Sequence, residues 1–174
     1  KSLVEQMLHR EQVIARAGAK AIEAHFISTE NGLKLLARSQ RIVTMREGVQ
    51  EMLEQYVSDR KGTPTTGIAV VNSEGKIIAN ANNLDQPAEI GVSVADRAYF
   101  AWAKTAREGE VYLDRPMVSR VGATKGQTII PVASPIIENG KFKGVAVAVV
   151  FLSKLTEIYL NPLKISGQTR IYLV

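Results

Sequence analysis

The chain has 174 residues, 45% of them hydrophobic and 22% charged, with a formal net charge of +5 at pH 7. This size and balance are typical of one soluble globular domain, alone or with a long appendage. The absence of cysteine excludes a disulfide framework, a thiolate nucleophile and a thiolate metal site. The basic surplus contains no run of four or more lysines or arginines, so we expect a solvated basic surface and no nucleic-acid partner.

Residues 1–59 are predicted to form a long helical stalk. Gly32 interrupts its periodicity, as at a kink, and Gly48 separates a second helix at 49–57. A helix of about 45 residues would be about 68 Å long, which is more than the rest of the domain can cover. A seven-residue repeat keeps one stripe facing a partner helix, so we expect a homodimer along part of this stripe. Its apolar members are Leu8, Ala15, Ile22, Leu36 and Val43.

Residues 60–160 are predicted to form an α+β module. The turn-rich segment RKGTPTT precedes a hairpin signal, in which an apolar strand and a strand at 76–81 flank a turn. Gly75 is the turn residue able to take a positive φ. After a polar loop, Ser93 is a candidate N-cap for a helix at 94–107.

The second half of this module has the pattern of a strand-rich sheet. Three further strands are predicted, at 110–114 with an extension to Ser119, at 128–137 and at 143–151. A short amphipathic helix follows at 153–160, and the segment 161–174 ends in a last strand, GQTRIYLV. Sequential hairpin strands favour an antiparallel sheet with helices segregated to one side, so the predicted fold class is α+β with five strands.

The residues that catalysis would need are missing. The two histidines, His9 and His25, both lie in the predicted stalk, so neither a zinc site nor a histidine-based triad can be assembled. The stretch from Gly122 to Gly126 lacks the spacing of a phosphate-binding loop. We therefore expect no enzyme, no catalytic residue, no metal and no cofactor.

Several short motifs follow one another in a specific order. These are DRAYF at 96–100, a strand ending in PMVS at Ser119, TIIPVASPI at 128–136, a glycine turn, and GVAVAVVFLSKL at 144–155. With the long helix before them, they resemble the Cache family of extracytoplasmic sensor domains, which have a PAS-like fold. The resemblance covers essentially the whole chain and rests on the order of the motifs, since each alone is common.

The resemblance implies the periplasmic or extracellular sensing part of a chemoreceptor, histidine kinase or diguanylate cyclase in the inner membrane. Such domains bind small molecules between the sheet and the segment that contains DRAYF. Their long helix continues into the membrane and pairs in a dimer, so flanking transmembrane helices are expected in the full-length protein. The strand in 161–174 would then open a second module or link to the membrane.

Arg97 is the residue on which the choice of ligand depends. From the residues alone it is either a surface charge, ion-paired with Asp96 or Glu108, or a group that binds the ligand. The resemblance favours ligand binding, because an arginine at this position commonly meets the ligand. A guanidinium offers a planar fork to a carboxylate and stays charged when partly buried.

The other candidates are less specific. Tyr99 is either a core residue or a cavity wall with a hydroxyl donor, and Asp96 is expected to cap or orient its segment. Phe100 and Trp102 are expected in the core, and Arg115 and Arg120 at the surface or closing over an anion. The remaining candidate ligand-binding residues are Tyr112, Met117, Ser119 and Ser134.

Two valines argue against an amino-acid ligand. Family members that bind α-amino acids tend to carry a tyrosine upstream of the arginine and an aspartate on the last strand, where this chain has Val92 and Val149. A buried ammonium beside valine would lack hydrogen bonds and counter-charge. The predicted ligand is a small organic anion, such as a short carboxylate, that binds Arg97 and Tyr99 and shifts the long helix. The alternative is a structural, dimerising module without a small-molecule ligand.

Overall fold

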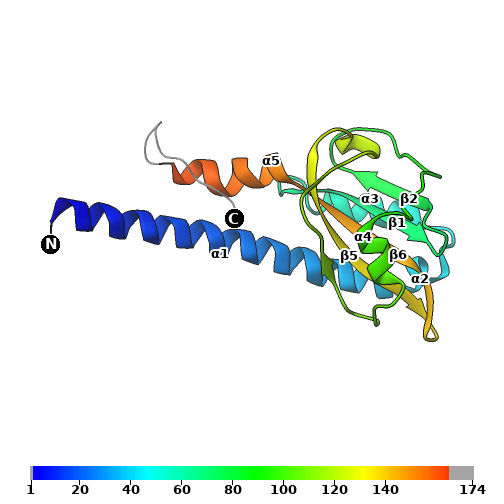
Figure 1. Cartoon of the computed structure of the whole chain (residues 1–174). Coiled ribbons are helices and arrows are strands. Elements are labelled where there is room, and N and C mark those ends of the chain that lie inside the picture. Colours follow the sequence, from blue (N-terminus) through cyan, green and yellow to red (C-terminus); the bar gives the residue numbers. More distant parts are fainter. Residues whose placement is uncertain (1, 165–174) are drawn as a thin grey trace.

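A computed structural model describes residues 2–164 of the chain. A long helix, α1, extends away from a sheet-based module, and the segment after the last strand turns back along it (Figure 1). The rings of His25 in α1 and Tyr159 in that returning segment lie 5.8 Å apart. The predicted α+β fold with a long N-terminal helix and an antiparallel sheet is confirmed, but the sheet has six strands where we expected five.

Three helices precede the sheet. The side chain of Ser2 accepts a hydrogen bond from the Glu5 amide, and Glu5 accepts one from the Ser2 amide, so a capping box begins α1. The expected kink at Gly32 is not an interruption, because α1 continues through it and ends one residue before Ser39, whose backbone is extended. The break predicted at Gly48 is confirmed. The helices are α1 (Leu3–Arg38), α2 (Gln40–Thr44) and α3 (Val49–Ser58).

The strands pair antiparallel in the order β2-β1-β6-β5-β3, with β4 also paired to β5. Gly75 takes the predicted positive φ, 82°, in the turn between β1 and β2. The strand predicted at 110–119 is divided into β3 and β4, because Pro116 has no amide hydrogen and cannot donate to the ladder. The strands are β1 (Thr65–Asn72), β2 (Ile77–Asn82), β3 (Tyr112–Leu113), β4 (Met117–Val118), β5 (Thr128–Glu138) and β6 (Lys141–Phe151).

Two predicted helices differ from the observed ones. The helix expected at 94–107 is only α4 (Ala98–Ala103), and Arg97 rather than Ser93 is its N-cap. The helix expected at 153–160 is α5 (Leu152–Leu155), continued by the π-helical turn η2 (Thr156–Leu160) and the 3₁₀ turn η3 (Asn161–Leu163). Another 3₁₀ turn, η1 (Gly122–Thr124), precedes β5. The strand predicted in GQTRIYLV lies outside the described residues.

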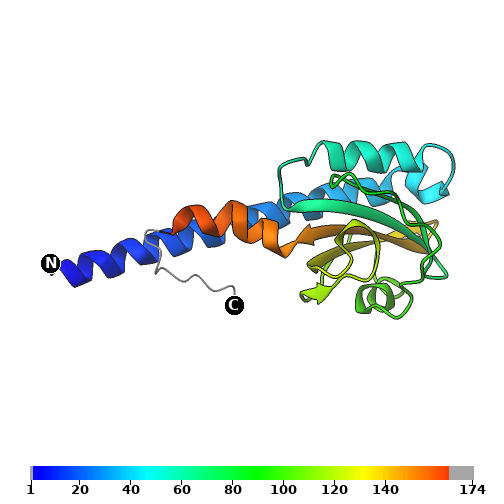
Figure 2. The same cartoon turned by 90° about the horizontal axis from the view of Figure 1, so that it is seen from above.

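Helices α1 to α3 cover one face of the sheet, and α4 lies on the other (Figure 2). The helix-facing core contains Leu33, Ile42, Leu53, Val70, Val132 and Val150. A smaller core on the opposite face contains Tyr99, Phe100, Ala133, Val145 and Val147.

The apolar stripe of α1 is divided between this core and solvent. Leu36 and Val43 are buried in the helix-facing core, and Ile22 packs against it, so the contact between two chains that we expected to include Val43 does not extend to it. Leu8 is 54% exposed, and Ala15 is also exposed. Among residues 2–164, no helix combines the length and the hydrophobicity needed to cross a membrane.

Candidate functional site

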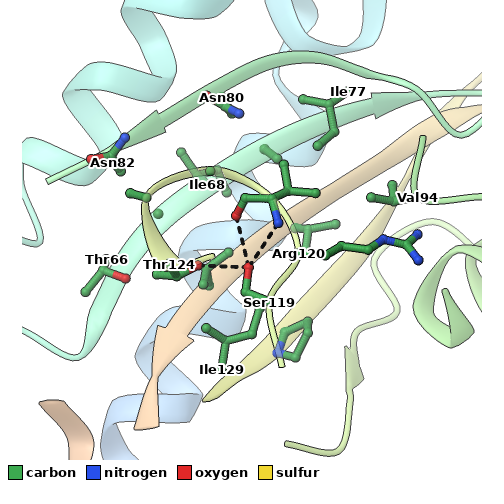
Figure 3. A pocket seen from close by; sticks show the side chains of 18 of the residues that line it. Thr66, Ile68, Ile77, Asn80, Asn82, Val94, Ser119, Arg120, Thr124 and Ile129 are labelled. Carbon is green, nitrogen blue, oxygen red and sulfur yellow. Dashed lines mark hydrogen bonds between the residues drawn. The ribbon is translucent and has the colours of Figure 1, made fainter. Parts of the chain in front are cut away.

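A cavity lies on the face of the sheet opposite α1 to α3 (Figure 3). It encloses about 770 Å³, open solvent at its mouth included. Strands β1, β2, β5 and β6 form its floor, while the segment before α4 and the stretch from β4 through η1 form its other walls. Few side-chain atoms stand above β1 on this face, because Gly67 and Ala69 are small. A methyl group at Gly67 would make only ordinary contacts, at 3.5 Å and beyond, so the missing side chain leaves room above the sheet.

A β-bulge at the start of β1 separates two neighbouring threonines. The pairing with β6 shifts between Thr65 and Gly67, and a bulge re-aims the side chains beside it. The Thr65 hydroxyl faces the helices, 3.1 Å from Nε2 of His25 and 3.0 Å from the Thr29 hydroxyl. The Thr66 side chain lines the cavity instead (Figure 3). Thr66 is only 1% exposed, and its hydroxyl has no hydrogen-bond partner in the described part of the chain.

Arg97 lines the cavity as the half-buried N-cap residue of α4. Its Nη1 donates a hydrogen bond to Sδ of Met117 at 3.4 Å. The ion pairs considered from the sequence do not form. Asp96 pairs with Arg120, and Glu108 pairs with Arg38 at 3.3 Å. Within residues 2–164, Arg97 has no carboxylate within salt-bridge distance.

The Asp96–Arg120 pair lies beside the cavity. Arg120 lines the wall, its Nη1 donates to Oδ2 of Asp96 at 2.7 Å, and its Nη2 contacts Oδ1. The hydrogen bonds from Arg120 lower the pKa of Asp96 to about 2. Of the two roles expected for Asp96, capping is wrong, because Arg97 is the N-cap residue of α4, while orienting the segment stays a prediction. Since Arg120 is already paired, Arg97 is the cavity-lining arginine that has no carboxylate at ion-pair distance within residues 2–164, although its charge also acts on Asp96 from farther away.

Tyr99 lines the cavity from the first turn of α4. Its side chain is 7% exposed, and this burial raises the pKa of its hydroxyl to about 12, against an opposing effect of Arg97. Tyr99 is therefore a neutral hydrogen-bond donor throughout the physiological pH range.

Of the other four predicted site residues, two line the cavity and two do not. Met117 and Ser119 line the cavity. The Ser119 hydroxyl donates to the Val121 carbonyl at 2.9 Å and accepts from the Thr124 hydroxyl at 3.1 Å. Tyr112 and Ser134 lie outside the wall, because Tyr112 stacks on Trp102 and the fully buried Ser134 donates to the Glu110 carbonyl at 3.0 Å.

Sequence analysis did not single out Thr66 or Asp114. Asp114 is 7% exposed, and its Oδ1 accepts from the Arg115 amide at 2.7 Å while its Oδ2 is buried without a partner. Its amide donates to the Pro131 carbonyl, so Asp114 lies next to a wall residue without lining the cavity itself. The sequence did contain a signal for Asp114. It stands two positions after Tyr112 in a predicted strand, and alternate residues of a strand share a face, so Asp114 was expected on the same face as a candidate site residue.

The charged residues described in the cavity wall, Arg97 and Arg120, are both basic. Among residues 2–164, no aspartate or glutamate lines the cavity, and Val149 contributes an apolar part of the wall. No cluster of three or more metal-binding side chains occurs in the part of the chain that the structure describes. The arrangement suits a small anion with an apolar body.

Comparison with known proteins gives a family and a set of similar folds. The family model named dCache_1, described as a Cache domain, matches residues 1–174. A search among curated proteins finds no sequence match.

Several solved structures are similar in fold. The ligand-binding domain of the Campylobacter jejuni chemoreceptor Tlp3, in complex with 4-methylisoleucine, has a TM-score of 0.69 at 12% identity, over 90% of this chain and 63% of that one. The corresponding domain of the Pseudomonas fluorescens chemoreceptor CtaA, in complex with L-serine, has a TM-score of 0.62 at 17% identity, over 88% and 61%. The extracellular domain of the putative histidine kinase mmHK1S-Z2 has a TM-score of 0.64 at 18% identity, over 87% and 64%. The chain thus spans less than two thirds of the length of each.

Proposed function

The chain belongs to the Cache domain family, and from this we propose that it is the extracytoplasmic ligand-sensing part of a transmembrane receptor. We propose further that its ligand is a small carboxylate held by Arg97 and Tyr99. The protein is then a binding module and not an enzyme.

The observation that carries this proposal is that Arg97 lines the cavity without a directly paired carboxylate among residues 2–164. A half-buried guanidinium without a counter-charge is unfavourable, and a carboxylate is the group that its planar fork fits best. The neighbouring Tyr99 hydroxyl, held neutral by burial, adds a second donor. The apolar floor suits a short hydrocarbon body, since small-molecule sites are mostly apolar with a few well-placed polar groups.

Signal transmission follows from the position of the cavity. The sheet that forms its floor carries α1 on its other face. The Thr65 hydroxyl connects the start of β1 to His25 and Thr29 of α1. A ligand that binds one arrangement of sheet and helix more tightly shifts the population toward it, and in the receptor that shift would move the transmembrane segments.

Calorimetry across a panel of short mono- and dicarboxylates, amino acids and amines tests the ligand class. A charge-assisted contact of this kind is worth about 2–5 kcal/mol when truncated, so Arg97→Ala should weaken carboxylate binding by well over tenfold. Arg115→Ala is the matched control, because Arg115 is exposed and does not line the cavity. Equal affinity of wild type and Arg97→Ala would reject the role of Arg97, and no binding across the panel would favour the structural, dimerising alternative.

A zwitterionic amino acid is the second candidate ligand, favoured by the bare Oδ2 of Asp114. If Asp114 rotated into the cavity, it would supply the counter-charge that Val149 cannot. Matched pairs of 2-hydroxy and 2-amino acids separate the two candidates. Preference for the amino acid, abolished by Asp114→Asn, would establish the zwitterion, whereas preference for the hydroxy acid in both proteins would exclude it.

We also propose that the exposed first half of α1 pairs two chains. Leu8 and Ala15 of the predicted stripe remain available there. Sedimentation at high concentration should show weaker self-association for Leu8→Glu than for wild type, with Arg10→Gln, an exposed position on the opposite side of the helix, as the control.

A further inference from the structure

Thr66 is a cavity-lining residue whose hydroxyl is buried and has no hydrogen-bond partner among the described residues. Thr66 is 1% exposed, and its Oγ1 has no partner among residues 2–164. Most buried hydroxyls in proteins are hydrogen-bonded, and an orphaned one is costly enough to need an explanation. Two other buried side-chain atoms, Oη of Tyr56 and Oδ2 of Asp114, share this condition, but Thr66 alone of the three lines the cavity.

The polar side chains nearby are already engaged in holding the walls together. Asn82 donates to the Gln86 carbonyl at 2.8 Å and accepts from two amides of the same loop, those of Leu84 and Gln86. Asn80 is likewise bonded to Glu89 in both directions. These asparagines fix the loop that follows β2, so they do not turn toward Thr66. The donor that remains uncommitted at this part of the floor is the Thr66 hydroxyl.

Thr66 and Arg97 belong to different walls. Thr66 lies on the first strand of the floor, next to Gly67, whereas Arg97 comes from the segment before α4. Figure 3 shows Thr66 with its hydroxyl directed toward the other lining side chains. The wall between these polar groups is lined by apolar residues such as Val149, Pro131 and Ile129.

We propose that the Thr66 hydroxyl binds a second oxygen function of the ligand, remote from the carboxylate that Arg97 holds. The ligand class is then a short carboxylate with a hydroxyl, keto or second carboxyl group at its far end, and not a plain aliphatic acid. This inference rests on the proposed function and makes Thr66 a specificity-determining residue. A site that hydrogen-bonds such a group discriminates against an analogue that lacks it, because the hydroxyl is then left buried and unpaired.

Matched ligands test the proposal directly. Calorimetry would compare butyrate with 4-hydroxybutyrate and succinate, and valerate with 5-hydroxyvalerate and glutarate, on three proteins. Wild type should prefer an oxygenated acid by roughly tenfold over its plain counterpart. Thr66→Val, which removes the hydroxyl at nearly constant shape, should bind the plain acid at least as tightly as wild type and lose the preference. Thr66→Ser, which retains the hydroxyl, should keep it.

The outcomes separate this inference from the proposed function. A preference that persists in Thr66→Val would overturn the role of Thr66 while leaving carboxylate binding intact. Equal binding of plain and oxygenated acids by wild type would overturn it as well. Failure of every acid to bind wild type would overturn both proposals together.

Discussion

A buried threonine hydroxyl is hydrogen-bonded on one face of the sheet and unpaired on the other. Thr65 and Thr66 are neighbours, and both are buried. On the helix-facing side, the Thr65 hydroxyl is bonded to His25 and Thr29. On the cavity side, the Thr66 hydroxyl is bonded to no described residue. The helix-facing core also contains one unpaired atom, Oη of Tyr56. The cavity face differs because its unpaired hydroxyl and its unpaired guanidinium both belong to residues that line a cavity, as expected of a surface completed by a ligand.

This contrast extends along the sheet. The helix-facing side packs large apolar side chains from α1, α2 and α3 on the strands. The other side covers its core with the short helix α4 and leaves a hollow over Gly67 and Ala69. Free energy is gained by close packing on the first face, whereas on the second it is partly forgone to keep space for binding.

A clear difference in stability is expected between two adjacent valines of β6. Val150 is fully buried in the helix-facing core, and Val149 is half-buried in the cavity wall. Val150→Ala should lower the free energy of unfolding by about 2 kcal/mol, through lost burial and a new void. Val149→Ala should cost less than about 1 kcal/mol, because its methyl groups already border a cavity. Urea denaturation measures both, and equal losses would contradict the contrast between the faces.

The two threonines give the next difference. Thr65→Val leaves two buried partners unpaired and should cost about 1–3 kcal/mol of stability. Thr66→Val should be neutral or slightly stabilising in the absence of ligand, since its hydroxyl makes no bond to lose. The same denaturation experiment without ligand compares them. A loss for Thr66→Val as large as that for Thr65→Val would mean that Thr66 has an internal partner.

His25 should make stability depend on pH through the helix-facing side alone. Burial, and then the nearby charge of Arg60, lower the pKa of His25 from 6.5. The unfolded chain therefore binds the proton more readily, so stability is full above about pH 6.5 and falls as the pH drops below it. The slope is at most about 1.4 kcal/mol per pH unit. Denaturation between pH 7.5 and 5 should show this slope in wild type and in His9→Gln, whose histidine is exposed, and a smaller one in His25→Gln.

The smallest effect concerns the exposed ion pair at the cavity. The pKa of Asp96 is lowered to about 2, first of all by hydrogen bonds from Arg120. In Arg120→Gln it should return toward the model-peptide value of 3.8, as followed by NMR titration of the carboxyl carbon. A pKa that stayed near 2 would show that Arg97, rather than Arg120, balances Asp96, and the free charge of Arg97 would be lost as an argument for the ligand.

The sequence was most informative where a local pattern repeats. The helical period within residues 1–59 and the apolar runs on either side of the turn at 138–142 predicted α1 and the β5–β6 hairpin. The order of motifs also placed Arg97 and Tyr99 in one segment beside a binding surface. Both residues do line the cavity, and their contact with a ligand stays a prediction.

What only the tertiary structure decided is which groups meet across long separations. Asp96 has a neighbour of opposite charge at 97, but its partner is Arg120, 24 positions away. Nothing in the sequence distinguishes Thr65 from Thr66. A one-residue bulge between β1 and β6 directs Thr65 toward the helices and places Thr66 at the cavity. Local patterns reflect the backbone period, which each segment carries by itself. Pairing and burial depend on the packing of several segments at once, so they are determined only when the chain has folded.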